Sequence, residues 1–453
     1  MPRRSNKRKA TIASSPLVEI TLLHRAMRLE LESICEKACR VLSSQQPETN
    51  SADASKLRDE MLDIHRRFNK FDVVFSSHSA AEDDFIFPML SRRGVPIASA
   101  VVGEHEEEGR MMAGALEHLN HRVGIGAPVG VDASDDALLL QRLVEVKERL
   151  SEHMLREEEA IFDSLTGFSD AELYDLVGLV LGSRSADTLA TMIQMEVAHL
   201  EPDLAKHVLS TMCAVTAKTQ FKAWLADALS PAAAAAADAP TAIDCKTAGD
   251  CGDSGKPAAR AAKRSRASAA VACPHYGHAA LVRAPCCGSF VGCHRCHDES
   301  AVCEKRMDAR LVTVMRCAHC ALEQPAAQHC SGCAARLGAY YCRVCRLWDE
   351  SGAPTYHCPY CNICRRGHGL GVDYHHCMKC NLCVALDRLA SHSCARDARC
   401  VACDDPFFAS DRRVDQLLCG HAAHSMCLDA AAAARGAAVD CRVCKIPCRR
   451  AVV

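Results

Sequence analysis

The segment after position 270 is too rich in cysteine and histidine to fold around an ordinary apolar core. The 453-residue chain has 31 cysteines and 22 histidines, of which 26 and 13 lie after position 270. Short turn-rich pieces separate the cysteine pairs there, and none shows the apolar periodicity of a packed domain. Such a segment folds either on disulfides or around metal ions.

The rest of the sequence favours metal ions over disulfides. The N-terminal stretch MPRRSNKRKATIASSP is basic and polar, and no apolar segment typical of a secretion signal follows it. No apolar run reaches the roughly 18 residues of a membrane span. We therefore expect an intracellular protein with reduced thiols, located in the nucleus, the cytoplasm or both. The net charge of −2 argues against bulk electrostatic binding of nucleic acid or a membrane surface.

The first half of the chain shows helical periodicity throughout. Apolar residues recur at helical spacing in four long segments, and further helical pattern continues to about position 229. An Ala-, Pro- and Lys-rich stretch then separates this half from the cysteine-rich half. The sequence thus predicts an all-α four-helix bundle followed by small zinc-stabilised modules. The four segments are residues 18–42, the region around 56–75, residues 101–123 and residues 136–162.

Two of these helices carry the pattern His-x-x-x-Glu, as His78 with Glu82 and His153 with Glu157. Residues four apart differ by about 40° around a helix, so each pair shares one face. The other two helices offer His24 and one further histidine, at position 105. Four inward-facing helices with imidazole and carboxylate donors can hold two iron ions. A lone histidine is more often a solvated surface residue, but the repeated pattern favours a metal site.

Other histidines of this half fit the pattern less well. His65 lies 13 residues before His78, about 220° round the same helix, and is therefore not expected to be a ligand. The Glu-x-x-His spacing of ferritin-like bundles occurs in this half only once, at Glu196 and His199, beyond the four helices.

The end of the chain carries the most specific pattern. Its ligand order Cys-Cys-Cys-His-His-Cys-Cys-Cys is that of a RING finger, in which alternate ligand pairs form two interleaved zinc sites. Two independent zinc ribbons are the alternative, which the CGHxxHxxC core disfavours. The eight residues are Cys400, Cys403, Cys419, His421, His424, Cys427, Cys441 and Cys444.

Taken together, the motifs HSAAEDDFIFPML, EHEEE, HMLREEEAIF, CPHY and GHGLGVDYHHCMKCNLC resemble one family. They are similar to the hemerythrin/CHY–CTCHY–RING zinc-finger ubiquitin ligases of the plant and algal BRUTUS/HRZ type. The resemblance implies a hemerythrin-like bundle with a diiron site and three zinc modules. The implied iron ligands are His24, His78, Glu82, His105, His153 and Glu157, with Glu108 as the candidate for a further carboxylate.

Composition and helical pattern place a basic disordered tail at 1–16, additional helices at 169–229 and a linker at 230–270. The resemblance names the other parts: a hemerythrin-like bundle at 17–168, a CHY finger at 271–337, a CTCHY finger at 338–398 and a RING finger at 399–447.

The resemblance also implies the zinc ligands of the two upstream fingers. With the RING these are 32 residues, enough for about eight four-coordinate zinc ions, and only Cys448 of the last 26 cysteines is left over. Cys303 stands where the family usually has histidine, and His375 is an alternative to His376. The CHY ligands are Cys273, His275, Cys286, Cys287, Cys293, Cys296, His297, Cys303, Cys317, Cys320, Cys330 and Cys333; the CTCHY ligands are Cys342, Cys345, His357, Cys358, Cys361, Cys364, His376, Cys377, Cys380, Cys383, His392 and Cys394.

The function implied by the resemblance is that of an iron-responsive RING-type ubiquitin-protein ligase. It would bind a ubiquitin-conjugating enzyme and a protein substrate, such as a transcription regulator of iron homeostasis, with no covalent ubiquitin intermediate. Ala402 replaces the usual Ile or Leu before the second zinc cysteine, and Arg442 replaces the usual Pro. These departures favour the main alternative, a non-catalytic iron- or oxygen-binding protein with a zinc scaffold. A zinc-dependent DNA-binding regulator and a diiron oxygenase are two further alternatives.

Overall fold

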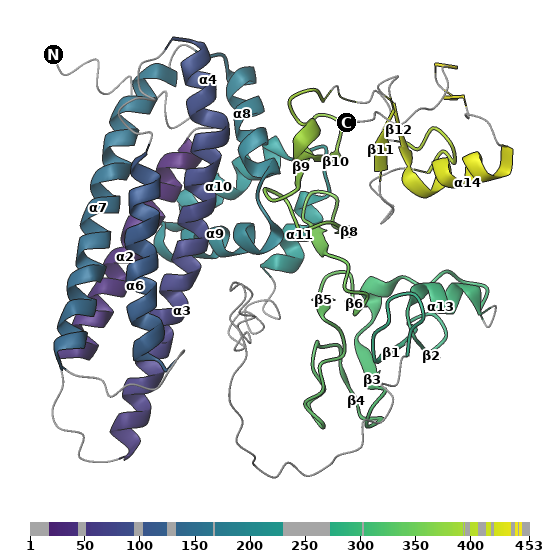
Figure 1. Cartoon of the computed structure of the whole chain (residues 1–453), viewed down its shortest axis with the longest axis horizontal. Helices are drawn as coiled ribbons and strands as arrows, with labels where there is room; N and C mark the ends of the chain where they lie inside the picture. The colour runs from purple at the N-terminus through teal and green to yellow at the C-terminus, as the bar shows by residue number, and fades with distance from the viewer. Residues whose placement is uncertain are drawn as a thin grey trace, which may run out of the picture.

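The computed structural model confirms the predicted architecture, with a helical N-terminal half followed by small antiparallel sheets among the cysteine pairs (Figure 1). No helix of the described residues is by itself long and apolar enough to cross a membrane. Two consecutive helices, Asp170–Gly182 and Ala186–His199, reach the necessary length and apolar content only when taken together, and they are bent by 115° relative to each other. The structure describes residues 18–43, 51–94, 103–124, 133–165, 168–229, 272–300, 303–392, 394, 399–405, 414–417, 421–435, 440–442 and 444–445.

The helical half is built on four long helices that pack side by side. The first contacts the second and the fourth, and the third contacts the same two, which closes the bundle. The second helix continues through one turn of π-helix into a short α-helix. The elements are α2 (Val18–Ser43), α3 (Ser51–Ala81), η1 (Glu82–Ile86), α4 (Phe87–Arg92), α6 (Glu104–Arg122) and α7 (Ala133–Leu165).

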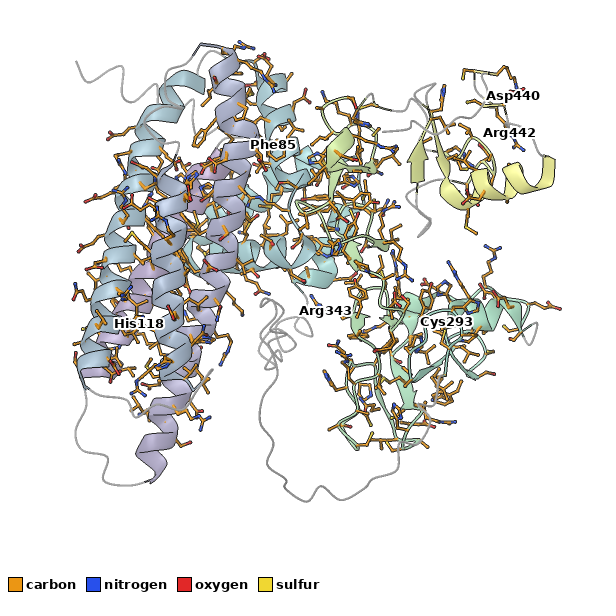
Figure 2. The ribbon with its side chains drawn as sticks, viewed as in Figure 1. Phe85, His118, Cys293, Arg343, Asp440 and Arg442 are labelled. Carbon is orange, nitrogen blue, oxygen red and sulfur yellow. The ribbon has the colours of Figure 1, made fainter. Side chains whose placement is uncertain are left out.

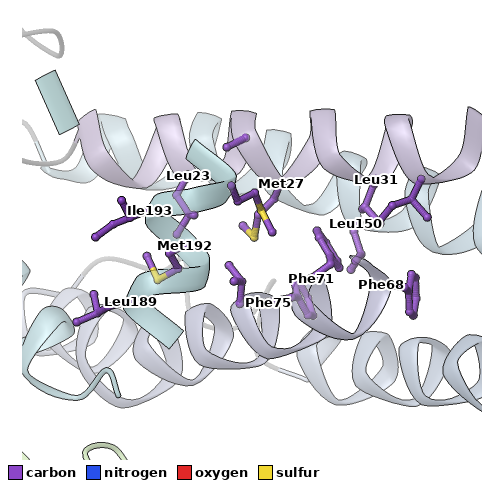
Figure 3. Packing of buried hydrophobic residues seen from close by; sticks show 14 of the residues in the cluster. Leu23, Met27, Leu31, Phe68, Phe71, Phe75, Leu150, Leu189, Met192 and Ile193 are labelled. Carbon is purple, nitrogen blue, oxygen red and sulfur yellow. The ribbon is translucent and has the colours of Figure 1, made fainter. Parts of the chain in front are cut away.

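The bundle core consists of aliphatic and aromatic side chains from the apolar stripe of each helix (Figure 3). Phe68 and Phe71 of α3 are fully buried, as are Met27 and Leu31 of α2, and Leu150 of α7 is 1% exposed. Burial of an aliphatic or aromatic side chain of this size contributes about 1.5–3 kcal/mol to folding. Burial of this stripe fixes which face of each helix points inward.

The π-turn η1 begins at the predicted metal ligand Glu82. The N–H of Phe87 donates to the carbonyl of Glu82, five residues back, so the hydrogen-bond ladder contains one extra residue there. Single π-turns of this kind are rare and often mark functional sites. Pro88 follows at the start of α4, where a missing N–H costs little.

Four shorter helices extend the helical half. Ser169 begins the first of them with a capping box to Glu172, and Ser185 caps the second by accepting from the N–H of Thr188. The second packs on α2 and α3, which anchors this extension to the bundle. These helices are α8 (Asp170–Gly182), α9 (Ala186–His199), α10 (Pro202–Val215) and α11 (Phe221–Ala228).

In its described residues the cysteine-rich half has one four-stranded antiparallel sheet and four two-stranded hairpins. The strands span two to four residues each, too few to be stable without metal ions or further packing. The sheet has the order β2 (Phe290–Val291), β1 (Ala280–Arg283), β3 (Val314–Cys317) and β4 (Glu323–Pro325), flanked by α13 (His294–Glu299) and η2 (Ala309–Leu311). The hairpins are β5 (Tyr340–Cys342) with β6 (Leu347–Asp349), β7 (Thr355–Cys358) with β8 (Ile363–Arg366), β9 (Tyr374–Cys377) with β10 (Leu382–Ala385), and β11 (Val414–Gln416) with β12 (Ala422–His424); η3 (Leu386–Arg388) follows β10 and α14 (Ser425–Arg435) follows β12.

The two halves share one apolar core. Tyr356, Tyr360 and Leu370 of the cysteine-rich half belong to the same buried cluster as the side chains of α2 and α9. Helix α8 contacts β9, and Figure 1 shows the two elements side by side. We refer to the predicted CTCHY finger, residues 338–398, as the second zinc region; it packs onto the helical half through these side chains.

A partly buried ionic network ties α9 to the bundle. Arg67 of α3 donates two hydrogen bonds to the Glu30 carboxylate of α2, at 2.9 and 2.8 Å, and His199 of α9 contacts the same carboxylate. Burial opposes ionisation of Glu30, but hydrogen bonds from His199 and Arg67 lower its pKa to about 2. Glu30 thus stabilises the fold fully above its ordinary pKa of 4.5, and this contribution is lost as pH falls towards 2.

We predict that Glu30→Gln lowers the free energy of unfolding of the helical half by about 1–3 kcal/mol, because it removes charge-assisted bonds from two partners. Asp63→Asn is the matched control: Asp63 pairs with Lys37 at 2.7 Å but is one-third exposed. Its loss should change stability by at most about 0.5 kcal/mol. Urea unfolding followed by helical circular dichroism measures both, and equal losses would contradict the prediction.

Candidate metal centres

The structure brings the four predicted histidines of the bundle together as two pairs. His24 Nε2 of α2 lies 2.7 Å from His78 Nε2 of α3. His105 Nε2 of α6 lies 3.1 Å from His153 Nε2 of α7. Each pair therefore points its Nε2 atoms at a common position.

The Glu82 carboxylate lies between these two histidine pairs. Its Oε1 is 3.3 Å from His78 Nε2, and its Oε2 is 3.6 Å from His105 Nε2. One carboxylate thus offers one oxygen to each pair, which is the arrangement of a bridging ligand between two metal ions.

The Glu157 carboxylate repeats this arrangement from the opposite helix. Its Oε1 lies 3.1 Å from His153 Nε2, and its Oε2 lies 3.8 Å from His24 Nε2. Both His-x-x-x-Glu patterns therefore supply a terminal imidazole and a carboxylate shared by both positions. We refer to His24, His78, Glu82, His105, His153 and Glu157 as the His–Glu cluster.

Burial and charge indicate that the His–Glu cluster requires cations. Glu82 is fully buried and Glu157 is 1% exposed, and in the described part of the chain the carboxylates face imidazole rings and each other without a hydrogen bond of good geometry. Burial opposes ionisation of Glu157, but contacts with His105 and His153 lower its pKa. Burial and the nearby negative charge of Glu157 raise the pKa of Glu82 well above its ordinary value. Burial lowers the pKa of His78, which keeps this imidazole in the neutral form that binds metal. Two buried carboxylates that share only imidazole neighbours are incompletely neutralised, which is costly, so this donor set fits bound cations.

Three acidic side chains that were not predicted from the sequence contact the Nδ1 atoms of the histidines, on the side of each ring opposite to Nε2. Asp83 Oδ1 lies 3.1 Å from Nδ1 of His105, and Glu104 Oε2 lies 2.9 Å from Nδ1 of His153. Glu158 Oε1 lies 3.3 Å from Nδ1 of the third, His24. Such contacts orient the ring and increase its basicity towards a metal ion. The acidic runs EDD, EHEEE and REEE, in which these residues stand, were the available signal.

Glu108, the candidate further ligand, lies elsewhere. Its Oε1 is 3.3 Å from Nδ1 of His153, on the side of the ring that faces away from the cluster. The side chain is fully buried, and burial raises the pKa of Glu108 to about 7. This placement favours a role in orienting His153 over direct ligation.

The histidines left out of the predicted site lie apart from the cluster. His65 contacts the Asn120 side chain of α6, with Nε2 and Oδ1 2.6 Å apart. His199 contacts Glu30, as described above. Glu196 is 2% exposed and lines a cavity of about 30 Å³ that His78 and Arg184 also line. The Glu-x-x-His spacing therefore does not contribute to the His–Glu cluster.

The predicted zinc ligands of the CHY region form three groups of four. In the first, His275 Nδ1 lies 3.3 Å from Cys296 Sγ. In the second, His297 Nε2 lies 3.2 Å from Cys286 Sγ, and Cys303 belongs to this group despite the absence of the usual histidine. The groups are Cys273, His275, Cys293 and Cys296; Cys286, Cys287, His297 and Cys303; and Cys317, Cys320, Cys330 and Cys333.

The CTCHY region forms three more groups, which are joined along the chain. His357 belongs to one group and the adjacent Cys358 to the next, and the same holds for His376 and Cys377. His376 Nδ1 faces its cysteines at 3.5 to 3.8 Å, whereas His375 points towards Phe85 of the helical half. The groups are Cys342, Cys345, His357 and Cys364; Cys358, Cys361, His376 and Cys383; and Cys377, Cys380, His392 and Cys394.

The RING-order segment shows one complete group. His424 Nδ1 lies 3.3 Å from Cys403 Sγ and 3.7 Å from Cys427 Sγ, and the His424 N–H donates to Cys400 Sγ. This combination of first and third ligand pairs is the interleaved order expected for a RING. Of the predicted second group, the structure describes His421, Cys441 and Cys444, whereas Cys419 and the leftover Cys448 lie outside the described residues.

The backbone after the cysteine pairs has a conformation that favours metal binding. Seven described non-glycine residues have positive φ, and each directly follows the second cysteine of a Cys-x2-Cys pair. The chain turns back there, so that N–H groups approach the first cysteine, as with Cys345 N to Cys342 Sγ at 3.3 Å. Asn and Asp tolerate left-handed backbone, but it is unfavourable for Ala, Arg and Lys and is retained there where the surroundings enforce it. The seven residues are Ala321, Ala334, Arg346, Asn362, Asn381, Asp404 and Lys445.

We predict that the full chain binds two iron ions and that Glu82→Ala or Glu157→Ala loses at least one, because each removes a carboxylate shared by both positions. His65→Ala is the control, since its ring contacts Asn120 instead. Elemental analysis after anaerobic loading with ferrous iron measures the difference. Equal iron contents in Glu82→Ala and His65→Ala would contradict the assignment.

Zinc content tests the cysteine groups. We predict about eight zinc ions per chain, because structural sites take four Cys or His ligands each. Cys361→Ser should lose one zinc ion, whereas Cys448→Ser should lose none, since Cys448 is outside the predicted ligand set. Five or fewer zinc ions in the folded wild-type chain would show that the ligand assignment is wrong.

Comparisons with known proteins agree with these two metal-binding halves. Residues 15–165 match the hemerythrin HHE cation binding domain, and residues 273–340 match the CHY zinc finger. The chain is 36% identical over 160 residues to a BRUTUS-like zinc finger protein of Arabidopsis thaliana. It is 35% identical over 159 residues to the E3 ubiquitin-protein ligase SRFP1 of Oryza sativa subsp. japonica, and 41% identical over 167 residues to the probable E3 ubiquitin-protein ligase RZFP34 of the same plant.

Each of these alignments covers 34% of this chain. They cover 12% of the BRUTUS-like protein, 60% of SRFP1 and 55% of RZFP34. The chain therefore matches only part of each relative. The resemblance found in the sequence motifs is confirmed: the chain joins a hemerythrin-like region to a CHY zinc finger and is similar to BRUTUS-type zinc finger proteins and E3 ubiquitin-protein ligases.

Proposed function

We propose that this protein is a RING-type ubiquitin ligase whose state depends on iron. The observation that carries the proposal is the combination, in one chain, of a buried His–Glu cluster and a zinc group in RING order. The names of relatives such as SRFP1 support the ligase part.

The RING-order segment would contribute by positioning. Val401, Leu417, Ala423 and Leu428 form a small buried cluster around Cys400, which fixes the loops that carry the zinc ligands. Such a surface would hold a ubiquitin-conjugating enzyme and orient its thioester for attack by a substrate lysine. No residue of this chain would form a covalent catalytic intermediate with ubiquitin.

The His–Glu cluster would supply the response to iron. Bound iron would provide a redox-active and oxygen-accessible centre, while the chain's own residues fix the two positions. A ligand that binds only the folded state stabilises that state in proportion to its occupancy. Since imidazoles alone incompletely neutralise the two buried carboxylates, iron would set the stability of the bundle and hence the amount or shape of the ligase.

The substrate and the location remain parts of this proposal. The resemblance points to regulators of iron homeostasis as substrates, and the basic clusters near positions 3–9 and 263–266 are weak nuclear-import signals. A ubiquitin-conjugating enzyme is the partner that the RING order requires.

A second candidate function is a non-catalytic iron- or oxygen-binding protein with a zinc scaffold. Ala402 is half-buried and small where a conjugating enzyme usually meets Ile or Leu, and Arg442 is exposed where Pro is usual. Loss of such an aliphatic contact costs about 1–3 kcal/mol of partner binding. The two candidates differ in whether any conjugating enzyme supports chain formation.

We predict that the full chain forms ubiquitin chains with at least one conjugating enzyme and that Cys400→Ala abolishes this, because it removes a zinc ligand. Cys39→Ala is the control, since Cys39 is an exposed helical cysteine outside the zinc groups. Ala402→Ile should raise activity about tenfold by restoring an aliphatic contact. Autoubiquitination across a panel of conjugating enzymes, with iron-loaded and iron-free protein, measures these effects.

Two outcomes would contradict the proposal, one its ligase part and the other its iron response. Wild-type protein that is inactive with every enzyme, while Ala402→Ile is active, would favour the scaffold function. Activity that is identical with and without iron would remove the iron response and leave a constitutive ligase.

A further inference from the structure

Helix α8 lies between the π-turn that carries Glu82 and the strand that carries two zinc ligands. On one side its residues Leu176 and Val180 pack against Ile86 and Phe87, which follow Glu82 in the chain. On the other side it contacts β9, which includes His376 and Cys377. Figure 1 shows α8 in this position, beside α4 and next to β9. A single helix therefore contacts the surroundings of both metal centres.

Glycines allow direct backbone contact between α8 and the zinc region. A Cβ at Gly182 would lie 2.6 Å from His375 Cε1 and closer still to the carbonyl oxygen of His376. A Cβ at Gly371 would overlap the carbonyl oxygen of Ser183 in the same way. By contrast, a Cβ at Gly178 would make only ordinary contact with Met378, at 3.4 Å. The contact at Gly182 is therefore too close for any side chain.

Polar anchors hold the same contact. The fully buried Tyr360 donates its hydroxyl to the carbonyl of Leu181, which satisfies one of the last carbonyls of α8. The Gln220 N–H donates to the carbonyl of Tyr360 at 2.7 Å. Lys379 pairs with Asp175 of α8 at 2.7 Å. We call the contact made by Asp175, Gly182, Tyr360, His375 and Lys379 the docking surface.

The π-turn also touches the docking surface directly. The Phe85 ring lies 5.9 Å from the His375 ring, measured between centroids. Figure 2 shows Phe85 on the side of the bundle that faces the zinc region. Phe85 is three residues from Glu82, and His375 is adjacent to His376. One aromatic contact thus separates a π-turn that carries a candidate iron ligand from a strand that carries candidate zinc ligands.

The turn that carries Glu82 is the part of the bundle best placed to respond to metal loss. Glu82 and Glu157 are buried without hydrogen-bond partners in the described residues, and a cation between them removes that cost. The π-turn already departs from the regular helix ladder, so it can rearrange without disrupting α3. Movement of Phe85 would remove its ring contact with His375, and movement of Ile86 would remove its apolar contact with α8.

We propose that the docking surface transmits metal occupancy of the His–Glu cluster to the second zinc region. With iron bound, η1, α8 and β9 form one packed unit. Without iron, η1 rearranges and the zinc region loosens from the helices while it keeps its zinc. As a mode of regulation this rests on the proposed function, whereas the structural coupling itself does not require ligase activity.

Hydrogen–deuterium exchange of the full chain tests the coupling. Protein produced without iron is compared with the same protein loaded anaerobically with ferrous iron, and peptides covering η1, α8 and β9–β10 are followed. In wild type, iron removal should speed exchange about tenfold in all three, because local opening of packed segments becomes easier. Gly182→Ala should leave the response in η1 but remove it from β9–β10, whose exchange should be fast in both states.

Gly178→Ala is the matched control on the same helix and should behave as wild type. Phe85→Ala provides a second test that leaves the zinc region unaltered, and it should weaken the response of β9–β10 without loss of iron. Zinc analysis of each variant verifies that its zinc groups are intact. The proposal is overturned if the exchange rate of β9–β10 in wild type is the same with and without iron. It is also overturned if both Gly182→Ala and Phe85→Ala keep the full effect of iron on that rate.

Ubiquitin-chain assays on the same samples separate this inference from the proposed function. Inactive protein with iron-dependent exchange in β9–β10 would reject the ligase and retain the coupling. Iron-responsive ligase activity with no exchange response in β9–β10 would retain the ligase and reject the docking surface as its route.

Discussion

Shared cations are the interaction on which this fold depends. Sulfur and nitrogen atoms of the zinc groups lie 3.2 to 3.9 Å apart, and the carboxylates of the His–Glu cluster are buried without hydrogen bonds. Such donors repel or remain unsatisfied unless a positive ion lies between them. The strands of the second half are too short to hold the chain alone. Metal ions bound at these groups would therefore hold its hairpins and turns in place.

Ligands that are close in sequence could be predicted, whereas their outer partners could not. His78 and Glu82 are four residues apart, so helix geometry alone places them on one face. Which atom Glu108 meets depends on how α6 is rotated against α7, and no local pattern gives that angle. Helix rotation also decides which residue of an acidic run faces a histidine. The sequence therefore does not distinguish Asp83, Glu104 and Glu158 from their acidic neighbours.

The contact between the halves was even less accessible to sequence reasoning. Capping residues and apolar periodicity predict that α8 is a helix, and its apolar composition predicts that it is buried. The sequence does not show that the face bearing Gly182 meets a zinc strand nearly two hundred residues later. A glycine at a helix end is usually interpreted as a terminator. Here the close approach of another backbone requires it as well.

The adjacent ligands of the CTCHY region have a consequence for how the protein acquires zinc. His357 and Cys358 serve neighbouring groups, as do His376 and Cys377, so fixing one group positions the first ligand of the next. Metal binding at one group therefore lowers the conformational entropy that the chain loses when the neighbouring group binds its own metal ion. Metal uptake by these three groups should be cooperative, with empty and fully loaded chains outnumbering partly loaded ones. Under zinc limitation a cell would hold fewer complete molecules rather than many incomplete ones.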